Sequence, residues 1–264
     1  VTAGPPCQDF SSSGSRKEGE RADLTVSCAL ILAEALPEWA VIENVPGMER
    51  SVAYRTARTI LKNAGYGLTE RVLDADLYGV AQARRRFFCV ARLGGPDGSM
   101  AADLERVKAT AKISVRQRFA EAGHDAEIDA FYRHPHNWGK KAIFSLDRPS
   151  PTIRGVNRPM PAHYGERYQP LTDTPNDADP REVPTGRVRS LTSHERALLQ
   201  GFPPDWSWPD VPKSRIDLMV GNAVPVGLAR AVAEDIVAPA MLTPGTPVDL
   251  ARFLGWMLEL ASFV

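Results

Sequence analysis

Gly4-Pro5-Pro6-Cys7-Gln8-Asp9-Phe10-Ser11 stands almost at the start of the chain, directly after three residues that are typical of a strand end. Two prolines fix their own φ angles and keep the residues before them extended, so this stretch predicts a rigid bend and not a helix. The bend holds Cys7 at a position that the backbone sets. A free cysteine is often only a small buried hydrophobe, so the bend alone leaves open whether Cys7 is core or nucleophile.

The chain outward from the bend alternates between loop, helix and strand. Residues 11–21 are small, polar and charged, which is typical both of a surface linker and of a lid beside Cys7. Residues 22–36 favour a buried helix, and residues 39–42 favour a buried parallel strand that leads into Glu43. Ligands bind at the carboxyl ends of the strands in an open α/β sheet, so Glu43 is a candidate functional carboxylate. The alternative is a helix cap or a surface charge.

The same alternation continues to residue 93 and predicts the fold class. Residues 51–64 favour an amphipathic helix with Gly65 as its stop signal, and residues 67–75 and 86–93 favour strands. We therefore expect an α/β layer with a mostly parallel sheet. The two strands with no clear helix between them suggest an antiparallel hairpin at one edge.

The composition changes after Gly94. Residues 99–111 look helical, and the rest of the chain to about residue 190 has little periodicity. Between Arg133 and Tyr168 there are seven Lys or Arg residues against two acids, with aromatic residues interleaved. This surface suits contact with phosphates and bases, and the alternative is a solvated irregular surface. Further helices are expected at 193–200, with Ser193 as a possible cap, and at 227–237 and 246–263.

Overall composition excludes several classes of protein. The 264 residues are 43% hydrophobic with zero formal net charge, which is typical of a globular protein and not of a disordered or membrane-spanning one. Three widely spaced cysteines give no disulfide framework, and the histidines lack metal-ligand spacing, so we expect no metal and a reducing cytoplasm. The chain lacks an initiator methionine, so its start looks cut from something longer.

Several short motifs in a fixed order resemble the C5-cytosine DNA methyltransferase family from residue 2 to about residue 237. Each motif is weak alone, and their order is specific. They are Pro6-Cys7-Gln8, Glu43-Asn44-Val45, Gln82-x-Arg84-x-Arg86, Arg-Pro-Ser-Pro-Thr-Ile at 148–153, Arg189-x-Leu191-Thr192 with Glu195, Leu199-Gln200-Gly201-Phe202-Pro203 and Gly221-Asn222-Ala223-Val224-Pro225.

The resemblance implies a role for each catalytic residue. Cys7 would add its thiolate to C6 of cytosine, which makes C5 able to attack a methyl group. Glu43 would protonate N3 or bond to it, and Arg84 would hold the base O2 and help to order the Cys7 loop. The target base must leave the helix stack to react, and the loop at 11–21 would close over it.

The resemblance also implies a fold, a cofactor and supporting residues. The fold would be a partial Rossmann-like sheet of an S-adenosylmethionine-dependent methyltransferase with a second, smaller DNA-recognition domain. The predicted parts are residues 1–93 (catalytic), 94–188 (target recognition) and 189–264 (return to the catalytic domain, plus a final helix). The supporting or DNA-binding candidates are Gln8, Ser11, Asn44, Gln82, Arg86, Arg148, Thr152 and Arg154, and the cofactor-binding candidates are Pro6, Asn222, Ala223 and Val224.

The chain departs from the family pattern mainly before Val1. No Phe-x-Gly-x-Gly loop precedes the bend, and Met219 and Val226 replace a usual glutamine and a frequent proline. We therefore expect a fragment or one half of a split enzyme, with a possible complementing N-terminal chain. Alone, the chain is expected neither to bind S-adenosylmethionine tightly nor to methylate DNA.

The expected partner is duplex DNA that contains a target cytosine, in a prokaryotic or phage-encoded system such as restriction-modification. Two alternatives stay open. One is a tRNA cytosine-5 methyltransferase, because one branch of the family keeps the same motifs. The other is a non-catalytic DNA-binding remnant.

Overall fold

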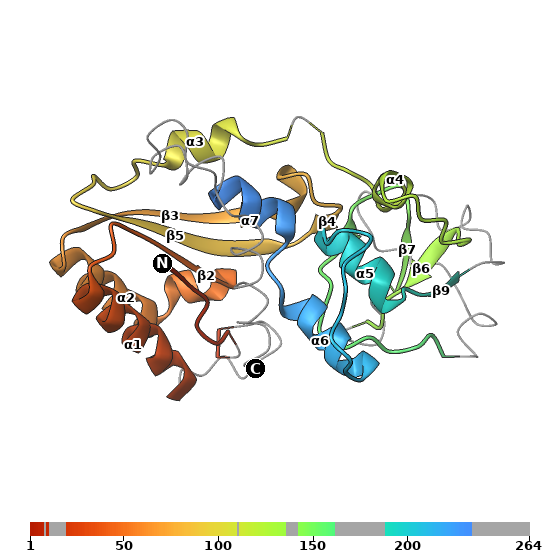
Figure 1. The fold of residues 1–264 in the computed structure, drawn as a ribbon, viewed down its shortest axis with the longest axis horizontal. Coiled ribbons are helices and arrows are strands. Elements are labelled where there is room, and N and C mark those ends of the chain that lie inside the picture. Colours follow the sequence, from red (N-terminus) through yellow and green to blue (C-terminus); the bar gives the residue numbers. More distant parts are fainter. Residues whose placement is uncertain (8, 11–19, 110, 136–141, 162–187, 234–264) are drawn as a thin grey trace.

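The computed structural model describes residues 1–7, 9–10, 20–109, 111–135, 142–161 and 188–233. Its largest sheet has four strands (Figure 1). In their order across the sheet they are β1 (Thr2–Ala3), β2 (Trp39–Asn44), β5 (Arg85–Leu93) and β3 (Tyr66–Asp74).

Strand pairing confirms the α/β class and the hairpin but not the mostly parallel sheet. Strand β1 is parallel to β2, whereas β5 is antiparallel both to β2 and to β3. The connection from β3 to β5 holds only a short 3₁₀ helix, η2 (Ala75–Leu77), and the two-residue strand β4 (Gln82–Ala83). A parallel return needs a crossover of a dozen or more residues, so this short connection forces the antiparallel arrangement.

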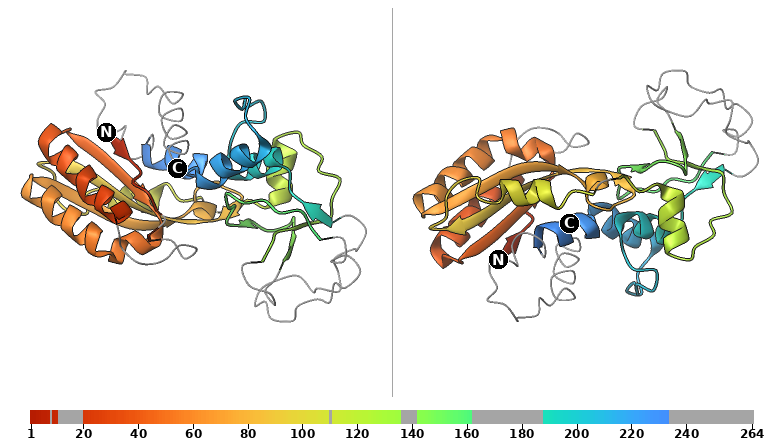
Figure 2. Two further views of the ribbon diagram at one scale, coloured as in Figure 1. Left: turned by 90° about the horizontal axis from the view of Figure 1, so that it is seen from below. Right: turned by 90° about the horizontal axis from the view of Figure 1, so that it is seen from above.

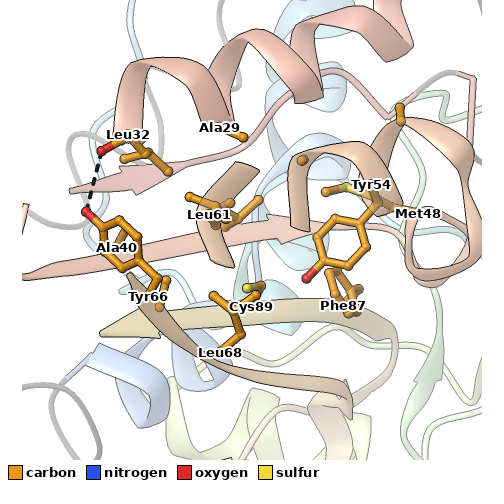
Figure 3. Close-up of a cluster of buried hydrophobic side chains, with 14 of the residues drawn as sticks. Ala29, Leu32, Ala40, Met48, Tyr54, Leu61, Tyr66, Leu68, Phe87 and Cys89 are labelled. Carbon is orange, nitrogen blue, oxygen red and sulfur yellow. Dashed lines mark hydrogen bonds between the residues drawn. The ribbon is translucent and has the colours of Figure 1, made fainter. Parts of the chain in front are cut away.

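Two helices, α1 (Glu20–Ala35) and α2 (Val52–Asn63), cover one face of the sheet (Figure 1). Their apolar side chains form a cluster with β2, β3 and β5, in which Tyr54 meets Phe87 edge to face at 4.8 Å (Figure 3). Cys89 is fully buried in this cluster. The helix α2 begins after Ser51, whose hydroxyl accepts from the Tyr54 amide at 3.0 Å, and it follows a 3₁₀ turn, η1 (Pro46–Arg50).

The opposite face of the sheet is covered by α3 (Ala101–Arg106) and α7 (Val226–Val232). Leu104 and Leu228 pack there against Trp39 and Phe88 of the sheet. The chain thus returns to this face at Val226, 120 residues after α3 ends at Arg106. Both helices begin close to their predicted positions, although α3 is shorter than the expected 99–111.

The other end of the molecule is built from short elements around a separate apolar cluster (Figures 1 and 2). Strand β4 pairs in parallel with β8, and β6 lies between β7 and β9. The bounds are α4 (Val115–Glu121), β6 (Ala130–Tyr132), β7 (Ile143–Ser145), β8 (Ser150–Pro151), β9 (Val188–Ser190), α5 (Ser193–Gln200) and α6 (Lys213–Asn222).

Two helix starts at this end differ from the sequence expectation. Helix α4 was not predicted, although Ser114 and Gln117 form a capping box that marks its start. Helix α5 is capped by Thr192 and not by Ser193, because Thr192 exchanges hydrogen bonds with Glu195 in the same way. Gly221 and Asn222 are the last residues of α6.

The division into three parts, with its two boundaries, stays a prediction. Helices α5 and α6 pack with Phe119, Phe131 and Ile153 at the small end, whereas α7 packs on the large sheet. The expected final helix at 246–263 and most of the loop at 11–21 lie outside the described residues. None of the described helices combines the length and the hydropathy needed to span a bilayer.

Gly221 marks the closest approach between α6 and the segment that follows β8. A Cβ atom added there would lie 2.1 Å from the backbone nitrogen of Gly155. We expect Gly221→Ala to lower the free energy of unfolding by about 2 kcal/mol or more, because backbone must move to make room. Urea unfolding measures this change. Gly98→Ala is the control, since nothing lies within 4 Å of its Cβ position and only its φ of +72° is unfavourable. Equal losses in the two variants would contradict the close contact.

Candidate active site

The Cys7 loop is tied to the end of the neighbouring strand. Asn44, the last residue of β2, is buried and donates through Nδ2 to the Pro5 carbonyl oxygen at 2.8 Å. The loop closes on itself where the Phe10 amide donates to the Cys7 carbonyl oxygen at 3.1 Å. Cys7 is therefore a half-buried thiol on a loop whose position is fixed by β2, in agreement with the rigid bend predicted from its prolines.

Glu43 lies beside Arg86 at the adjacent strand ends. In the antiparallel register Glu43 is opposite Phe88, so Arg86 projects from the same face two residues along. Arg86 Nε is 3.0 Å from Glu43 Oε1, and the two side chains are 14% and 20% exposed. Sequence reasoning gave Arg86 only a bracing or DNA-contacting role and missed this pair, because it depends on the register of β2 and β5.

One oxygen of Glu43 keeps its capacity to accept a hydrogen bond. Oε1 is buried and accepts no hydrogen bond from a described residue, since Arg86 reaches it at ion-pair distance but without hydrogen-bond geometry. Buried polar atoms are nearly always hydrogen-bonded in folded proteins. The unsatisfied oxygen therefore suits a ligand that brings its own donor.

Electrostatic coupling joins Cys7, Glu43, Arg84 and Arg86 into one cluster. Burial raises the pKa of the Cys7 thiol, while Arg86 and Arg84 act to lower that pKa and Glu43 acts to raise it. Burial likewise raises the pKa of the Glu43 carboxyl, and the same two arginines oppose this rise. The arrangement therefore favours a neutral thiol and a carboxyl that can hold a proton.

Arg84 is fully buried and acts as a tether between distant segments. Its guanidinium donates to the carbonyl oxygens of Ile153 and Gly221, both at 2.7 Å, and of Ala223 at 3.1 Å. Burial lowers the pKa of this guanidinium well below its usual range. Its Nε is buried and has no hydrogen-bond partner among the described residues. The predicted contact of Arg84 with a base stays a prediction.

Two buried glutamines extend this tether. Gln82 accepts from the Ile153 amide at 2.8 Å and donates to Gln200 Oε1 at 2.9 Å, and Gln200 donates to the Val220 carbonyl oxygen at 2.5 Å. Gln82 therefore braces β4. Gln200 was not singled out from the sequence, and its only signal was its place in the Leu-Gln-Gly-Phe-Pro motif.

The other predicted supporting residues are dispersed. Thr152 Oγ1 donates to the Ala83 carbonyl oxygen at 2.9 Å, Arg154 donates to the His134 carbonyl oxygen, and Arg148 is exposed. Gln8 and Ser11 lie outside the described residues.

Three of the four residues predicted to hold a cofactor lie beside the tether, and the fourth, Pro6, lies on the Cys7 loop. Asn222 and Val224 are half-buried, and Ala223 between them is buried with its carbonyl oxygen bonded to Arg84 and Gln200. Val224 also packs against the apolar cluster that contains Trp39. These residues fit one side of an organic cofactor, because they present an amide and an apolar surface on a fixed backbone. Within the described ranges there is no group of three or more metal-ligating side chains.

Burial raises the pKa of the Cys7 thiol, and the positive charge of Arg86 opposes that rise. Because this charge favours the thiolate, we expect Arg86→Gln to raise the Cys7 pKa further and to move thiol alkylation to higher pH. The measurement is the pH dependence of iodoacetamide labelling, with the Cys7 peptide followed by mass spectrometry so that Cys28 does not interfere. Arg85→Gln, on the exposed neighbour, should leave the profile unchanged. An unshifted profile in Arg86→Gln would show that Arg86 does not act on the thiol.

Comparison with known proteins gives a consistent family. A family model described as C-5 cytosine-specific DNA methylase matches residues 1–238. The Type II methyltransferase M.HindV of Haemophilus influenzae is 40% identical over 238 residues, which cover 90% of this chain and 74% of that protein. The Type II methyltransferase M.HgiDI of Herpetosiphon aurantiacus is 41% identical over 239 residues, covering 90% and 72%.

A more distant relative and a solved structure extend this likeness. The tRNA (cytosine(38)-C(5))-methyltransferase of Schizosaccharomyces pombe is 24% identical over 254 residues, which cover 90% of this chain and 76% of that protein. The crystal structure of the Dnmt2 methyltransferase from the same yeast aligns with a TM-score of 0.56 at 20% identity, covering 91% of this chain and 78% of that chain. At this identity the structural likeness shows the fold.

Proposed function

The chain belongs to the C-5 cytosine-specific DNA methylase family, and we propose that Cys7, Glu43 and Arg86 form the centre at which a cytosine of duplex DNA is methylated. The observation that supports these roles is the cluster at the ends of β1 and β2. It combines a half-buried thiol on a fixed loop with a carboxyl that has one unsatisfied buried oxygen. The relatives at 40% identity are Type II methyltransferases, which favours DNA as the substrate.

The proposed reaction begins with addition to the cytosine ring. The Cys7 thiol gives its proton to water and its sulfur bonds to C6, and the π-electron pair of the C5–C6 double bond moves toward C5. Glu43 holds a proton at N3 of the base, which offsets the charge that develops on the ring. The raised pKa of Glu43 suits this task, because the carboxyl must carry the proton when the base arrives.

When bound, S-adenosylmethionine would supply the electrophilic methyl group for C5. The Asn222–Val224 loop would hold it, and Arg84 fixes that loop to β4 through the Ala223 carbonyl oxygen. After C5 is methylated, it loses its proton to water, and the C6–S bond breaks with its electron pair on sulfur. The N3 proton returns to the Glu43 carboxylate, and the Cys7 thiolate takes up a proton from water. Since C6 of a stacked base is out of reach, the cytosine must be flipped from the duplex into this site.

Arg86 has a supporting role in this proposal. Its charge lowers the pKa of Cys7 and of Glu43 together, so it favours the thiolate at the cost of the protonated carboxyl. Arg84 is proposed to place the base only indirectly or after rearrangement, because its guanidinium is bonded to three carbonyl oxygens.

Methylation of tRNA is the second candidate, and one comparison favours it. The tRNA methyltransferase relative covers the same share of the chain, but at 24% identity against 40% for the Type II enzymes. We include in the proposal a role in restriction-modification in a bacterial cytoplasm, because the relatives M.HindV and M.HgiDI are Type II methyltransferases. The assembled catalytic cluster speaks against a non-catalytic remnant.

The test is covalent trapping on DNA with 5-fluorocytosine at the target position. The protein is expressed with any in-frame coding sequence that precedes Val1 and is incubated with S-adenosylmethionine and trapping duplexes of varied sequence. Fluorine cannot leave C5 as a proton does, so the C6–S bond should persist and the Cys7 peptide should carry the nucleotide. Trapping on 5-fluorocytosine tRNA alone would favour the second candidate. An adduct on Cys28, or DNA binding with no adduct, would overturn the roles given to the cluster.

A further inference from the structure

A recess at the small end of the molecule has four arginines among the eleven residues that line it. It is bounded by β6 and the two residues that follow β6, by the segment after β8, and by Leu191. Phe131, Ile153 and Leu191 give it an apolar lining, and Arg133, Arg154 and Arg158 give it three positive charges. None of these arginines belongs to the catalytic cluster.

Among the described residues, no carboxylate forms an ion pair with Arg133, Arg154 or Arg158. Burial, followed by the charge of Arg154, lowers the pKa of Arg133 to about 10. Burial and then the charge of Arg158 lower the pKa of Arg154. In addition, Arg133 Nε is buried without a hydrogen-bond partner among the described residues. Cations gathered in a partly buried site repel one another. A bound anion would relieve this repulsion, so the recess favours an anion.

Arg196 also lines the recess, but its positive charge is matched by a carboxylate. Its guanidinium pairs with the buried carboxylate of Asp217 and donates to the Arg154 carbonyl oxygen. Arg196 therefore holds the backbone of the recess in place, and its charge is already matched. Because the charge of Arg196 is already matched, the arginines that can bind an anion are the other three, Arg133, Arg154 and Arg158.

His134 positions Arg158 without adding charge. Arg158 Nη1 lies 3.2 Å from His134 Nε2, and a guanidinium can only donate, so Nε2 accepts. The proton of the neutral ring is then on Nδ1, which lies 3.0 Å from the Tyr132 hydroxyl. Burial, Arg158 and Arg154 all lower the His134 pKa, which keeps the ring neutral.

We propose that this recess binds one backbone phosphate of the substrate DNA, an inference that rests on DNA being the substrate. Arginine forks match the oxygens of a phosphodiester, and three of them converge on a single hollow. Ile153 connects the recess to the catalytic end, because its carbonyl oxygen and amide are bonded to Arg84 and Gln82. A phosphate held here fixes the DNA strand relative to β4, and so relative to the Cys7 cluster.

The experiment is a binding scan with duplexes in which one phosphate at a time is an uncharged methylphosphonate. With the wild-type protein, a methylphosphonate at one position, or at either of two adjacent positions, should weaken binding by about 10-fold. This is the effect expected from the loss of one charge-assisted contact. Arg158→Gln should weaken binding to the normal duplex and should abolish the effect at that position only. The exposed Arg158 is chosen first because its loss leaves the core intact. Arg154→Lys gives a second variant, which keeps a charge but loses the fork, and its effect at that position should be intermediate.

Arg55→Gln, on α2 at the other end of the molecule, is the matched control and should leave the whole scan unchanged. A scan in Arg158→Gln that keeps the wild-type profile overturns the phosphate site. The proposal is also overturned if inorganic phosphate stabilises the wild-type protein but Arg158→Gln leaves the scan unchanged, because the recess then binds a free anion and not the DNA backbone. If the wild-type protein forms the Cys7 adduct but the scan is flat, only this inference fails. If it binds tRNA and no duplex DNA, the proposed substrate fails as well.

Discussion

Cys7→Ser is expected to reduce methyl transfer by at least about 10⁴-fold, the range seen when a covalent nucleophile is removed from an enzyme. A serine hydroxyl at this place is far less acidic than a thiol, and burial, which already raises the pKa of Cys7, would raise that of the hydroxyl too. The adduct with 5-fluorocytosine DNA should disappear as well. Affinity for the normal duplex should change little, because the loop is held by the Asn44–Pro5 hydrogen bond and not by the sulfur.

The measurement combines single-turnover methylation with duplex binding, both on protein expressed with any coding sequence upstream of Val1. Cys28→Ser is the control, since Cys28 is a half-buried thiol on α1 outside the cluster, and burial raises its pKa to about 11. That variant should keep wild-type turnover. Turnover above about one hundredth of the wild-type rate in Cys7→Ser would mean that the sulfur does not attack C6, since no other nucleophile supplies that rate.

The parts of the site that the sequence predicts are those set by local chemistry. Two prolines define the Cys7 bend, and a short apolar run that ends in Glu43 defines a strand end, so each residue could be found within its own segment. The strands at 66–74 and 85–93 follow in the same way from their composition, with bounds one residue from the prediction.

The parts that the sequence does not predict depend on contacts between distant segments. Arg84 bonds to carbonyl oxygens 69 and 137 residues away, and no periodicity around Arg84 records those partners. The Glu43–Arg86 pair requires the register of β2 against β5, and that register exists only because β5 enters between β2 and β3. The residue patterns of single segments predict β2 and β5 as strands, but they do not predict that these two strands lie side by side. Pairing then decided both the direction of the sheet and the partner of the carboxylate.

Arg84→Leu is expected to lower the free energy of unfolding by about 3 to 5 kcal/mol, the usual result of removing one member of a buried charged network. Leucine replaces the guanidinium volume only in part, and the carbonyl oxygens of Ile153, Gly221 and Ala223 lose their donors inside the protein. Each unsatisfied buried acceptor costs about 1 to 3 kcal/mol. Burial and the charge of Arg86 lower the pKa of this guanidinium, so the cost of burying the cation in the wild type acts in the opposite direction, and Glu43 and the three carbonyl oxygens offset only part of it.

The tether predicts where this variant should loosen first. Hydrogen exchange should accelerate at Ile153 and Ala223 more than in α1 or α2, since Arg84 joins β4 to both segments and the helices pack on a separate cluster. Arg84→Lys should recover part of the stability, because an ammonium keeps a donor for one or two of the carbonyl oxygens. Arg85→Leu, on the exposed neighbour, controls for charge loss on the same strand and should be near neutral. An Arg84→Leu variant as stable as the wild type would show that desolvation of the guanidinium outweighs its three hydrogen bonds, and Arg84 would then be retained for its action on Cys7 and Glu43 alone.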